Sequence, residues 1–162
     1  MRLSEVLILT IGGLILYRSG RKIESEINPD GQVDVVARTI WGEARGEGTN
    51  GMQAVANVIM NRTARGGWYG LTPAEVCEKP YQFSCWNSSD PNYKPMLSVT
   101  DSDKEFRQAL ELAEKAVSGQ LPDITGGATE YHAKSIKPSS WNWQKLTQTT
   151  TIGDHIFYRS VA

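Results

Sequence analysis

Glu43 is the residue of this sequence best placed to do acid–base chemistry. It stands in the stretch W-G-E-A-R-G-E (residues 41–47), directly after a glycine. Apolar residues at 33, 36, 37, 40, 41 and 44 recur with the spacing of a helix that buries one face, so Glu43 is expected near the C-terminal end of a core helix. Partial burial and the negative end of the helix dipole both favour the protonated form of a carboxyl there. Such a carboxyl could act as a general acid; the alternative is a solvated charge in a helix-to-loop turn.

Several other side chains could support this acid or bind a ligand beside it. Two charged residues follow Glu43 at once, and Glu47 is expected to hold the loop by pairing with Arg45 or Arg62. The polar residues of the next helix lie off its apolar stripe, and they either hold the Glu43 loop by hydrogen bonds or face solvent. The remaining candidates are a tryptophan that could stack on a ligand in a cleft and three residues of the predicted sheet. These three either line the cleft or only make hydrogen bonds within the sheet. These candidates are Arg45, Glu47, Gln53, Asn57, Trp86, Tyr131, His132 and His155.

Composition excludes some classes of function. The net charge of the 162 residues is −1, with 17 basic and 18 acidic side chains, so no basic field points to nucleic acid as a partner. The chain has two His and two Cys, with no H-E-x-x-H or C-x-x-C motif, and we predict no metal and no other cofactor. Cys77 and Cys85 either form a disulfide or remain two buried free thiols.

The periodicity predicts helices first and a small antiparallel sheet last. Asn50 is a plausible cap for a second helix that stops at Gly66-Gly67, and Thr72 and Ser102 each open a capping box. From Gly126 the helical rhythm stops. A strand is predicted over 128–133, and strands over 147–152 and 155–159 flank the hairpin signal Gly153-Asp154. The predicted fold class is therefore α+β, in one domain over residues 33–162.

The N-terminal part is organised differently. Residues 1–22 contain an apolar run at 3–17, and residues 23–32 are polar, carry the turn signal N-P-D-G and are interpreted as a linker. Three interpretations of the run stay open: a weak membrane anchor, an interaction helix buried against other subunits, and a helix packed on its own domain. The run is shorter than the roughly 20 residues of a bilayer span, and more Lys and Arg follow it than precede it, which disfavours export of the C-terminal part.

Five short motifs give the chain a recognisable likeness. They are A-R-T-I-W-G-E-A-R-G-E (37–47), G-M-Q-A-V-A-N-V-I-M-N-R (51–62), Q-F-S-C-W (82–86), G-A-T-E-Y-H-A (127–133) and G-D-H-I-F-Y (153–158). In type and order they resemble the SleB-type cell-wall hydrolases, which include spore-cortex-lytic enzymes and phage relatives. Glu130 is a departure, because the family more often has a histidine there. The resemblance covers roughly residues 33–159.

The resemblance implies a lysozyme-like α+β fold and a peptidoglycan-degrading enzyme. It implies that Glu43 is the catalytic acid and that the β-1,4 bond from N-acetylmuramic acid to N-acetylglucosamine is cleaved, by the lytic transglycosylase route with one carboxyl. A true hydrolase needs a second carboxylate, for which Glu47 is the nearest candidate and Asp154 and Glu130 are distant ones.

Other classes of function remain as alternatives. An amidase or peptidase acting on the stem peptide would use both histidines with zinc, or a cysteine–histidine pair. A non-catalytic virion component would keep the fold alone. The implied location is the periplasm or cell wall of a bacterial host, with tethering at the inner membrane through residues 3–17 before release, or packaging in a phage particle beside other virion proteins.

Overall fold

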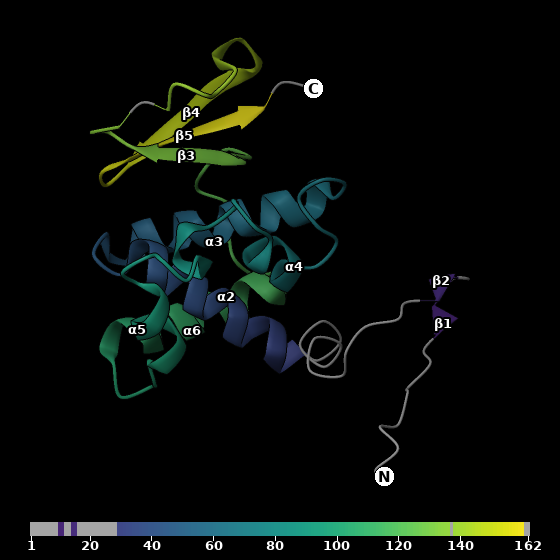
Figure 1. Cartoon of the computed structure of the whole chain (residues 1–162), viewed down its shortest axis with the longest axis vertical. Coiled ribbons are helices and arrows are strands. Elements are labelled where there is room, and N and C mark those ends of the chain that lie inside the picture. The colour runs from purple at the N-terminus through teal and green to yellow at the C-terminus, as the bar shows by residue number, and fades with distance from the viewer. Residues whose placement is uncertain (1–9, 12–13, 16–28, 137, 161–162) are drawn as a thin grey trace.

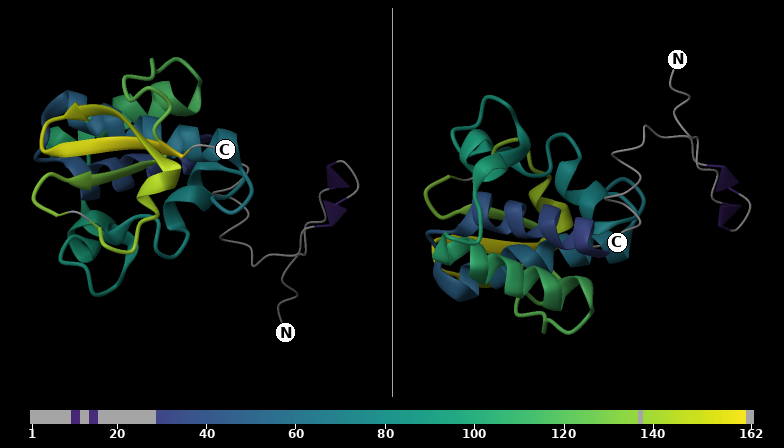
Figure 2. Two further views of the ribbon diagram at one scale, coloured as in Figure 1. Left: turned by 90° about the horizontal axis from the view of Figure 1, so that it is seen from above. Right: turned by 90° about the horizontal axis from the view of Figure 1, so that it is seen from below.

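The computed structural model describes residues 10–11, 14–15, 29–136 and 138–160, and in them helices precede a three-stranded sheet (Figure 1). The sheet covers one side of a layer of helices, as views from above and below show (Figure 2). The α+β prediction is therefore confirmed. The elements of this body are α2 (Pro29–Ala44), α3 (Gly48–Arg65), α4 (Pro73–Glu78), η1 (Ser84–Trp86), α5 (Tyr93–Ser98), α6 (Lys104–Val117), β3 (Glu130–Ala133), η2 (Trp143–Lys145), β4 (Leu146–Ile152) and β5 (His155–Ser160).

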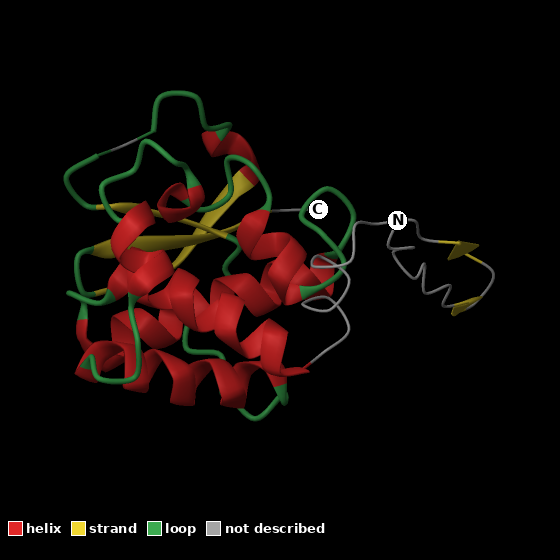
Figure 3. Ribbon diagram, turned by 60° about the horizontal axis from the view of Figure 1, so that its bottom comes forward, coloured by secondary structure: helices red, strands yellow, loops and turns green. Residues whose placement is uncertain are grey.

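Helix α2 is the central element of the helical layer, which is shown in red in Figure 3. It packs against α3, α4, α5 and α6, and Val36, Ala37 and Ile40 on its apolar stripe are fully buried. The helix begins earlier than predicted, because Pro29 suits the first helical position and Asp30 lies in the first turn. Residues 29–32 therefore belong to α2 and not to the linker predicted over 23–32.

The capping predictions were correct for one helix and wrong for two. The Thr72 hydroxyl accepts from the backbone N–H of Glu75, which is one half of a capping box, whereas the Glu75 carboxylate accepts the N–H of Leu71 rather than that of Thr72. Helix α6 is capped by Asp103 rather than Ser102, because its carboxylate accepts the N–H of Phe106 at 2.8 Å. Helix α3 begins at Gly48, so Asn50 lies inside it and caps nothing.

The sheet has the strand order β3-β5-β4, with antiparallel pairing throughout. The predicted hairpin at Gly153-Asp154 is confirmed, since Ile152 pairs with His155 across it. Tyr131 pairs with Phe157, which is fully buried, and this face of the sheet packs against the helices. His132 lies on the opposite face, where it stacks on Tyr158.

The N-terminal predictions fall mostly outside the described residues. Within residues 1–22, Thr10–Ile11 (β1) pairs with Leu14–Ile15 (β2) as antiparallel strands, so the predicted helix does not run through these residues. The rest of this segment, and residues 23–28 of the predicted linker, are not described. In the part of the chain that the structure describes, no helix is long and apolar enough to cross a bilayer.

Candidate active site

Glu43 lies in the last turn of α2, half-buried, as the periodicity predicted. The residue before it, Gly42, lets the segment around η1 approach the helix closely. A Cβ at Gly42 would lie 2.7 Å from Cβ of Cys85 and 3.1 Å from its sulfur. The glycine in the G-E pair therefore has a packing reason: it brings the backbone of η1 against the carboxyl.

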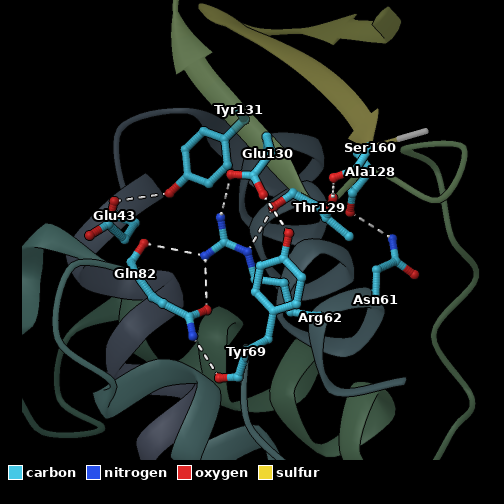
Figure 4. A network of polar contacts seen from close by, with 10 residues as sticks. All are labelled: Glu43, Asn61, Arg62, Tyr69, Gln82, Ala128, Thr129, Glu130, Tyr131 and Ser160. Atoms are coloured by element: carbon cyan, nitrogen blue, oxygen red, sulfur yellow. Dashed lines mark hydrogen bonds and ion pairs between the residues drawn. The ribbon is translucent and has the colours of Figure 1, made fainter. Parts of the chain in front are cut away.

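Three hydrogen-bond donors meet at the Glu43 carboxylate. The backbone N–H of Cys85 donates to Oε1 at 2.9 Å, and the hydroxyl of Ser84 makes a long 3.5 Å contact with the same oxygen. The Tyr131 hydroxyl donates to Oε2 at 3.0 Å (Figure 4). Hydrogen bonds to a carboxylate are charge-assisted and stronger than those between neutral groups. These contacts hold the Glu43 carboxyl in one orientation.

Tyr131 is held as a neutral donor. Burial, and next the Glu43 carboxylate, raise the pKa of its phenol well above the usual value. Its ring stacks on Phe157 at 5.5 Å between centroids and meets the edge of His155 at 5.2 Å. These contacts fix the ring, so the hydroxyl points at Glu43 in the protonated state over the whole physiological pH range.

Glu47 fastens the β4–β5 hairpin to the turn after α2. Its Oε2 accepts the backbone N–H of Asp154 at 2.9 Å and lies 3.8 Å from Nδ1 of His155. A Cβ on Gly51 or on Gly153 would collide with the Glu47 side chain, so both glycines leave room for it. The predicted pairing of Glu47 with Arg45 or Arg62 is wrong, because the carboxylate instead binds the turn of the β4–β5 hairpin, which lies far away in the sequence.

Arg45 holds a different loop. Its guanidinium lies 4.3 Å above the Trp41 ring and donates to Oδ1 of Asn92 at 2.7 Å, which fixes the segment before α5 to the end of α2. It also borders a hollow of about 500 Å³ between the start of α3 and the start of α6, and Glu43 does not line that hollow.

The amides on α3 do not reach the Glu43 loop, which was one of the two alternatives for them. Gln53 and Asn57 both donate to the carbonyl oxygen of Pro122, at 2.9 and 3.1 Å, and Asn57 also accepts the N–H of Ile124. Asn61 donates to the carbonyl of Ala128 at 3.0 Å. They therefore fix the segment that leads into β3.

Two aromatic candidates are also engaged elsewhere. The indole N–H of Trp86 donates to the Thr39 hydroxyl at 2.9 Å, and the ring packs against the helical core. Nε2 of His132 lies 3.1 Å from the Tyr158 hydroxyl, and its ring meets Trp141 and Trp143 edge to face on the far side of the sheet. His155 is the histidine that lies near Glu43, through the Tyr131 ring.

The two cysteines are buried free thiols, which settles the disulfide question. Burial raises the pKa of the Cys77 thiol to about 12, and burial followed by the Glu43 carboxylate raises the pKa of Cys85 still further. A nucleophilic thiol needs a lowered pKa, so neither side chain is activated for attack. Among the described residues no group of three His, Cys, Asp or Glu side chains is arranged to hold a metal ion.

From the sequence, Arg62 was predicted only as a possible partner of Glu47. The structure buries it to 5% exposure beside Glu130, Tyr69 and Gln82 (Figure 4). The sequence did contain one signal for its burial: Arg62 is a cation that comes three residues after the buried apolar Ile59 on α3. Its partners lie 20 and 68 residues away in the sequence, so no local pattern identifies them.

Comparison with known proteins gives the same family from three directions. A family model described as Cell Wall Hydrolase matches residues 46–158, a range that begins just after Glu43. The spore cortex-lytic enzyme of Halalkalibacterium halodurans is 31% identical over 128 residues, which is 79% of this chain and 34% of that enzyme. The spore cortex-lytic enzyme of Bacillus cereus is 31% identical over 127 residues, or 77% of this chain and 43% of that one. This chain thus spans well under half the length of these relatives.

Two solved structures share the fold. The catalytic domain of Bacillus cereus SleB has a TM-score of 0.62 and 28% identity, and the match covers 79% of this chain and 89% of that domain. The catalytic domain of the germination-specific lytic transglycosylase SleB of Bacillus anthracis gives the same TM-score and identity, covering 79% of this chain and 93% of that one. The predicted lysozyme-like α+β fold is confirmed by these two matches.

Proposed function

Because this chain belongs to the SleB-type family of cell wall hydrolases, we propose that it cleaves the glycan strands of peptidoglycan with Glu43 as its catalytic acid. The observation that carries the proposal is the set of donors around one carboxyl. The N–H of Cys85 and the hydroxyl of Tyr131 bind different oxygens of Glu43 at 2.9 and 3.0 Å. Both bonds strengthen as the carboxyl becomes an anion, which is the charge that a general acid acquires when it gives up its proton.

The reaction that fits is intramolecular transfer. Protonated Glu43 donates its proton to the glycosidic oxygen, and the bond from that oxygen to C1 of N-acetylmuramic acid breaks. The N-acetylglucosamine unit leaves with a free hydroxyl, and positive charge develops at C1. The C6 hydroxyl of the same muramic acid then attacks C1, and the Glu43 carboxylate takes the proton of that hydroxyl. The product carries a 1,6-anhydro ring, and Glu43 returns to its protonated form.

A single carboxyl is enough for this route, and the contacts of two neighbouring carboxylates support it. Glu47 is bound to the Asp154 N–H, and Glu130 is paired with Arg62 at 3.3 Å. A second carboxylate in a hydrolase must face the substrate or its attacking water. The similarity to the Bacillus anthracis SleB domain, a germination-specific lytic transglycosylase, agrees with this route.

True hydrolysis is the second candidate, with Glu47 as the base that activates water. It is favoured by the position of Glu47 on the turn directly after α2, with a side chain that is 22% exposed. An amidase or peptidase is a weaker alternative, because burial keeps both thiols protonated and the two histidines lie on opposite faces of the sheet.

The proposed place of action is the cell wall, where the substrate lies. Tethering through residues 3–17 and packaging in a phage particle remain hypotheses about the N-terminal segment. Fractionation of cells with and without membrane depolarisation tests the tether: an enzyme that stays soluble in both conditions contradicts it.

Mass spectrometry of the fragments released from purified peptidoglycan tests the reaction, with Glu43→Gln as the control. We expect fragments that end in 1,6-anhydromuramic acid, and we expect the variant to release none. Fragments heavier by one water would mean hydrolysis, and Glu47→Gln should then be inactive as well. Free stem peptides beside intact glycan would reject the proposed class of reaction.

A further inference from the structure

Arg62 makes contacts with two separate segments of the chain at once. Its Nε donates to the carbonyl oxygen of Thr129 at 2.7 Å, and Nη2 lies 3.3 Å from Oε2 of Glu130. On its other side, Nη1 donates to both oxygens of Gln82, the carbonyl at 3.3 Å and Oε1 at 3.4 Å (Figure 4). A guanidinium is planar and rigid, so the positions of these acceptors are fixed relative to one another.

Both segments lead directly to the donors on Glu43. Thr129 and Glu130 come immediately before Tyr131, whose hydroxyl binds Oε2. Gln82 comes shortly before Ser84 and Cys85, which bind Oε1. We call these two segments, residues 82–85 and 129–131, the two arms that hold the carboxylate. The distance between the arms is therefore set by one cation, Arg62, which does not itself touch Glu43 in this structure.

The surroundings of Arg62 favour one arrangement only. The side chain is 6% exposed, so an unpaired guanidinium there would be strongly unfavourable. Glu130 supplies the opposite charge and is fixed in turn by the Tyr69 hydroxyl at 2.7 Å. The guanidinium carbon lies 4.9 Å from the centroid of the Phe83 ring and 5.5 Å from that of Tyr69, so aromatic rings hold it from further directions.

We propose that Arg62, with Glu130 as its counter-ion, is the positioning residue of this active site: it sets the separation of the Tyr131 hydroxyl and the Cys85 N–H, and through them the orientation of the Glu43 carboxyl. This inference rests on the proposed role of Glu43 and adds to it the group that aligns it. A misplacement of about 1 Å in a catalytic group can reduce the rate by about a hundredfold, so the effect of Arg62 should appear in kcat.

The preceding residue, Asn61, provides a matched control. It lies on the same helix and binds the same incoming segment, through Ala128 and Thr125, but it makes no contact with Gln82 or Glu130. Asn61→Ala therefore weakens the attachment of the segment before β3 without touching the second arm. Arg62→Lys keeps the positive charge and loses the fork that joins the two arms.

The first measurement does not depend on activity. In ¹⁵N-labelled protein, the amide proton signal of Cys85 reports its bond to the carboxylate. We expect Arg62→Lys to move this signal upfield and to speed its exchange with deuterium, whereas Asn61→Ala leaves both unchanged. A Cys85 signal that responds equally to both variants would overturn the proposal. If Arg62→Lys does not fold, Glu130→Gln keeps the shape of the network, and we expect a smaller change of the same sign.

The second measurement is the rate at which suspended peptidoglycan loses turbidity, taken well below the melting temperature of every variant. We expect kcat of Arg62→Lys to fall about 10- to 100-fold with KM changed less than about threefold, and Asn61→Ala to stay near the parent protein. In a Tyr131→Phe background the same Arg62→Lys change should have a smaller effect, because one arm is already lost. The proposal would be overturned if the losses in kcat from Arg62→Lys and Tyr131→Phe simply multiplied in the double variant. It would also be overturned if Asn61→Ala lowered kcat as much as Arg62→Lys does.

The two proposals can fail separately. Turbidity registers the cleavage of any bond that solubilises the wall, so the comparison of variants holds whichever product forms. Product analysis of the parent digest tests the reaction. If the parent protein cleaved no peptidoglycan at all, the proposed function would fall, and the Cys85 amide signal would still decide whether Arg62 holds the two arms.

Discussion

Removing a single oxygen atom, in Tyr131→Phe, tests the role of the phenol at Glu43. Phenylalanine keeps the stacking on Phe157 and the edge contact with His155, while the 3.0 Å bond to Oε2 is lost. A hydrogen bond to a charged group contributes about 1.5–3 kcal/mol. In the transition state of the proposed first step, the negative charge on Glu43 is only partly developed. Loss of this hydrogen bond should therefore raise the activation barrier by an amount between roughly half of the smaller value and all of the larger one.

With about 1.4 kcal/mol for each factor of ten, kcat should fall roughly 3- to 140-fold, with little change in KM. The matched control is Tyr158→Phe, which removes a hydroxyl 3.1 Å from Nε2 of His132 on the far face of the same sheet. It should lower the free energy of unfolding by about 1 kcal/mol and leave kcat within about twofold. The assay is turbidity loss at several peptidoglycan concentrations, with urea unfolding of each variant. If Tyr131→Phe lost stability alone, as Tyr158→Phe is expected to, the phenol would have no part in the chemistry.

Further predictions concern close packing and the thiols. Gly42→Ala should lower the free energy of unfolding by about 1–3 kcal/mol in urea titration and reduce activity too, since its Cβ would lie 2.7 Å from that of Cys85; Gly46→Ala, with no atom within 4 Å, should change stability by less than about 0.5 kcal/mol. Gly153→Ala should be more destabilising than Gly48→Ala, because both positions have positive φ but only a Cβ at 153 meets Glu47; equal losses would mean that backbone strain alone matters. Cys77 should resist iodoacetamide at pH 8 until the protein is unfolded. Because folding raises the pKa of its thiol from 9.0 to about 12, the contribution of the buried thiol to stability is complete below pH 9 and declines as the pH rises toward 12. Urea titrations across that pH range would detect this decline. Rapid alkylation of the native protein would contradict the burial.

The sequence predicted those features that depend on local periodicity and turn chemistry. The long helices, the end of α3 at Gly66 and the hairpin at Gly153-Asp154 follow from spacing and from glycines at turn positions, and the structure has them. The errors at caps are small for a physical reason. Ser102 and Asp103 are both good capping residues, and sequence alone does not say which of two neighbours takes the position; here the Asp103 carboxylate also accepts the indole N–H of Trp41.

The candidate site was predictable only at its centre. The position of Glu43 at the end of a buried stripe was visible in the sequence. Tyr131 was among the candidate site residues, but its contact with Glu43 was not predicted. The link between them spans 88 residues, and that from Cys85 to Glu43 spans 42. Trp86 was assigned to a cleft because aromatic residues gather in its segment, but Thr39 on the core helix takes its N–H. Such pairings depend on which helix the loop crosses, and no spacing rule encodes that.

The pairing of the strands also governs when the site can exist. Strand β3 carries Tyr131, yet it pairs with β5 and not with β4, which precedes β5 in the chain. A chain synthesised or refolded only as far as β4 would contain Glu43, Cys85 and Arg62, but the strand with the phenol would have no neighbour to hold it. Catalytic competence should therefore arise in one late step, when His155–Ser160 inserts between the other two strands.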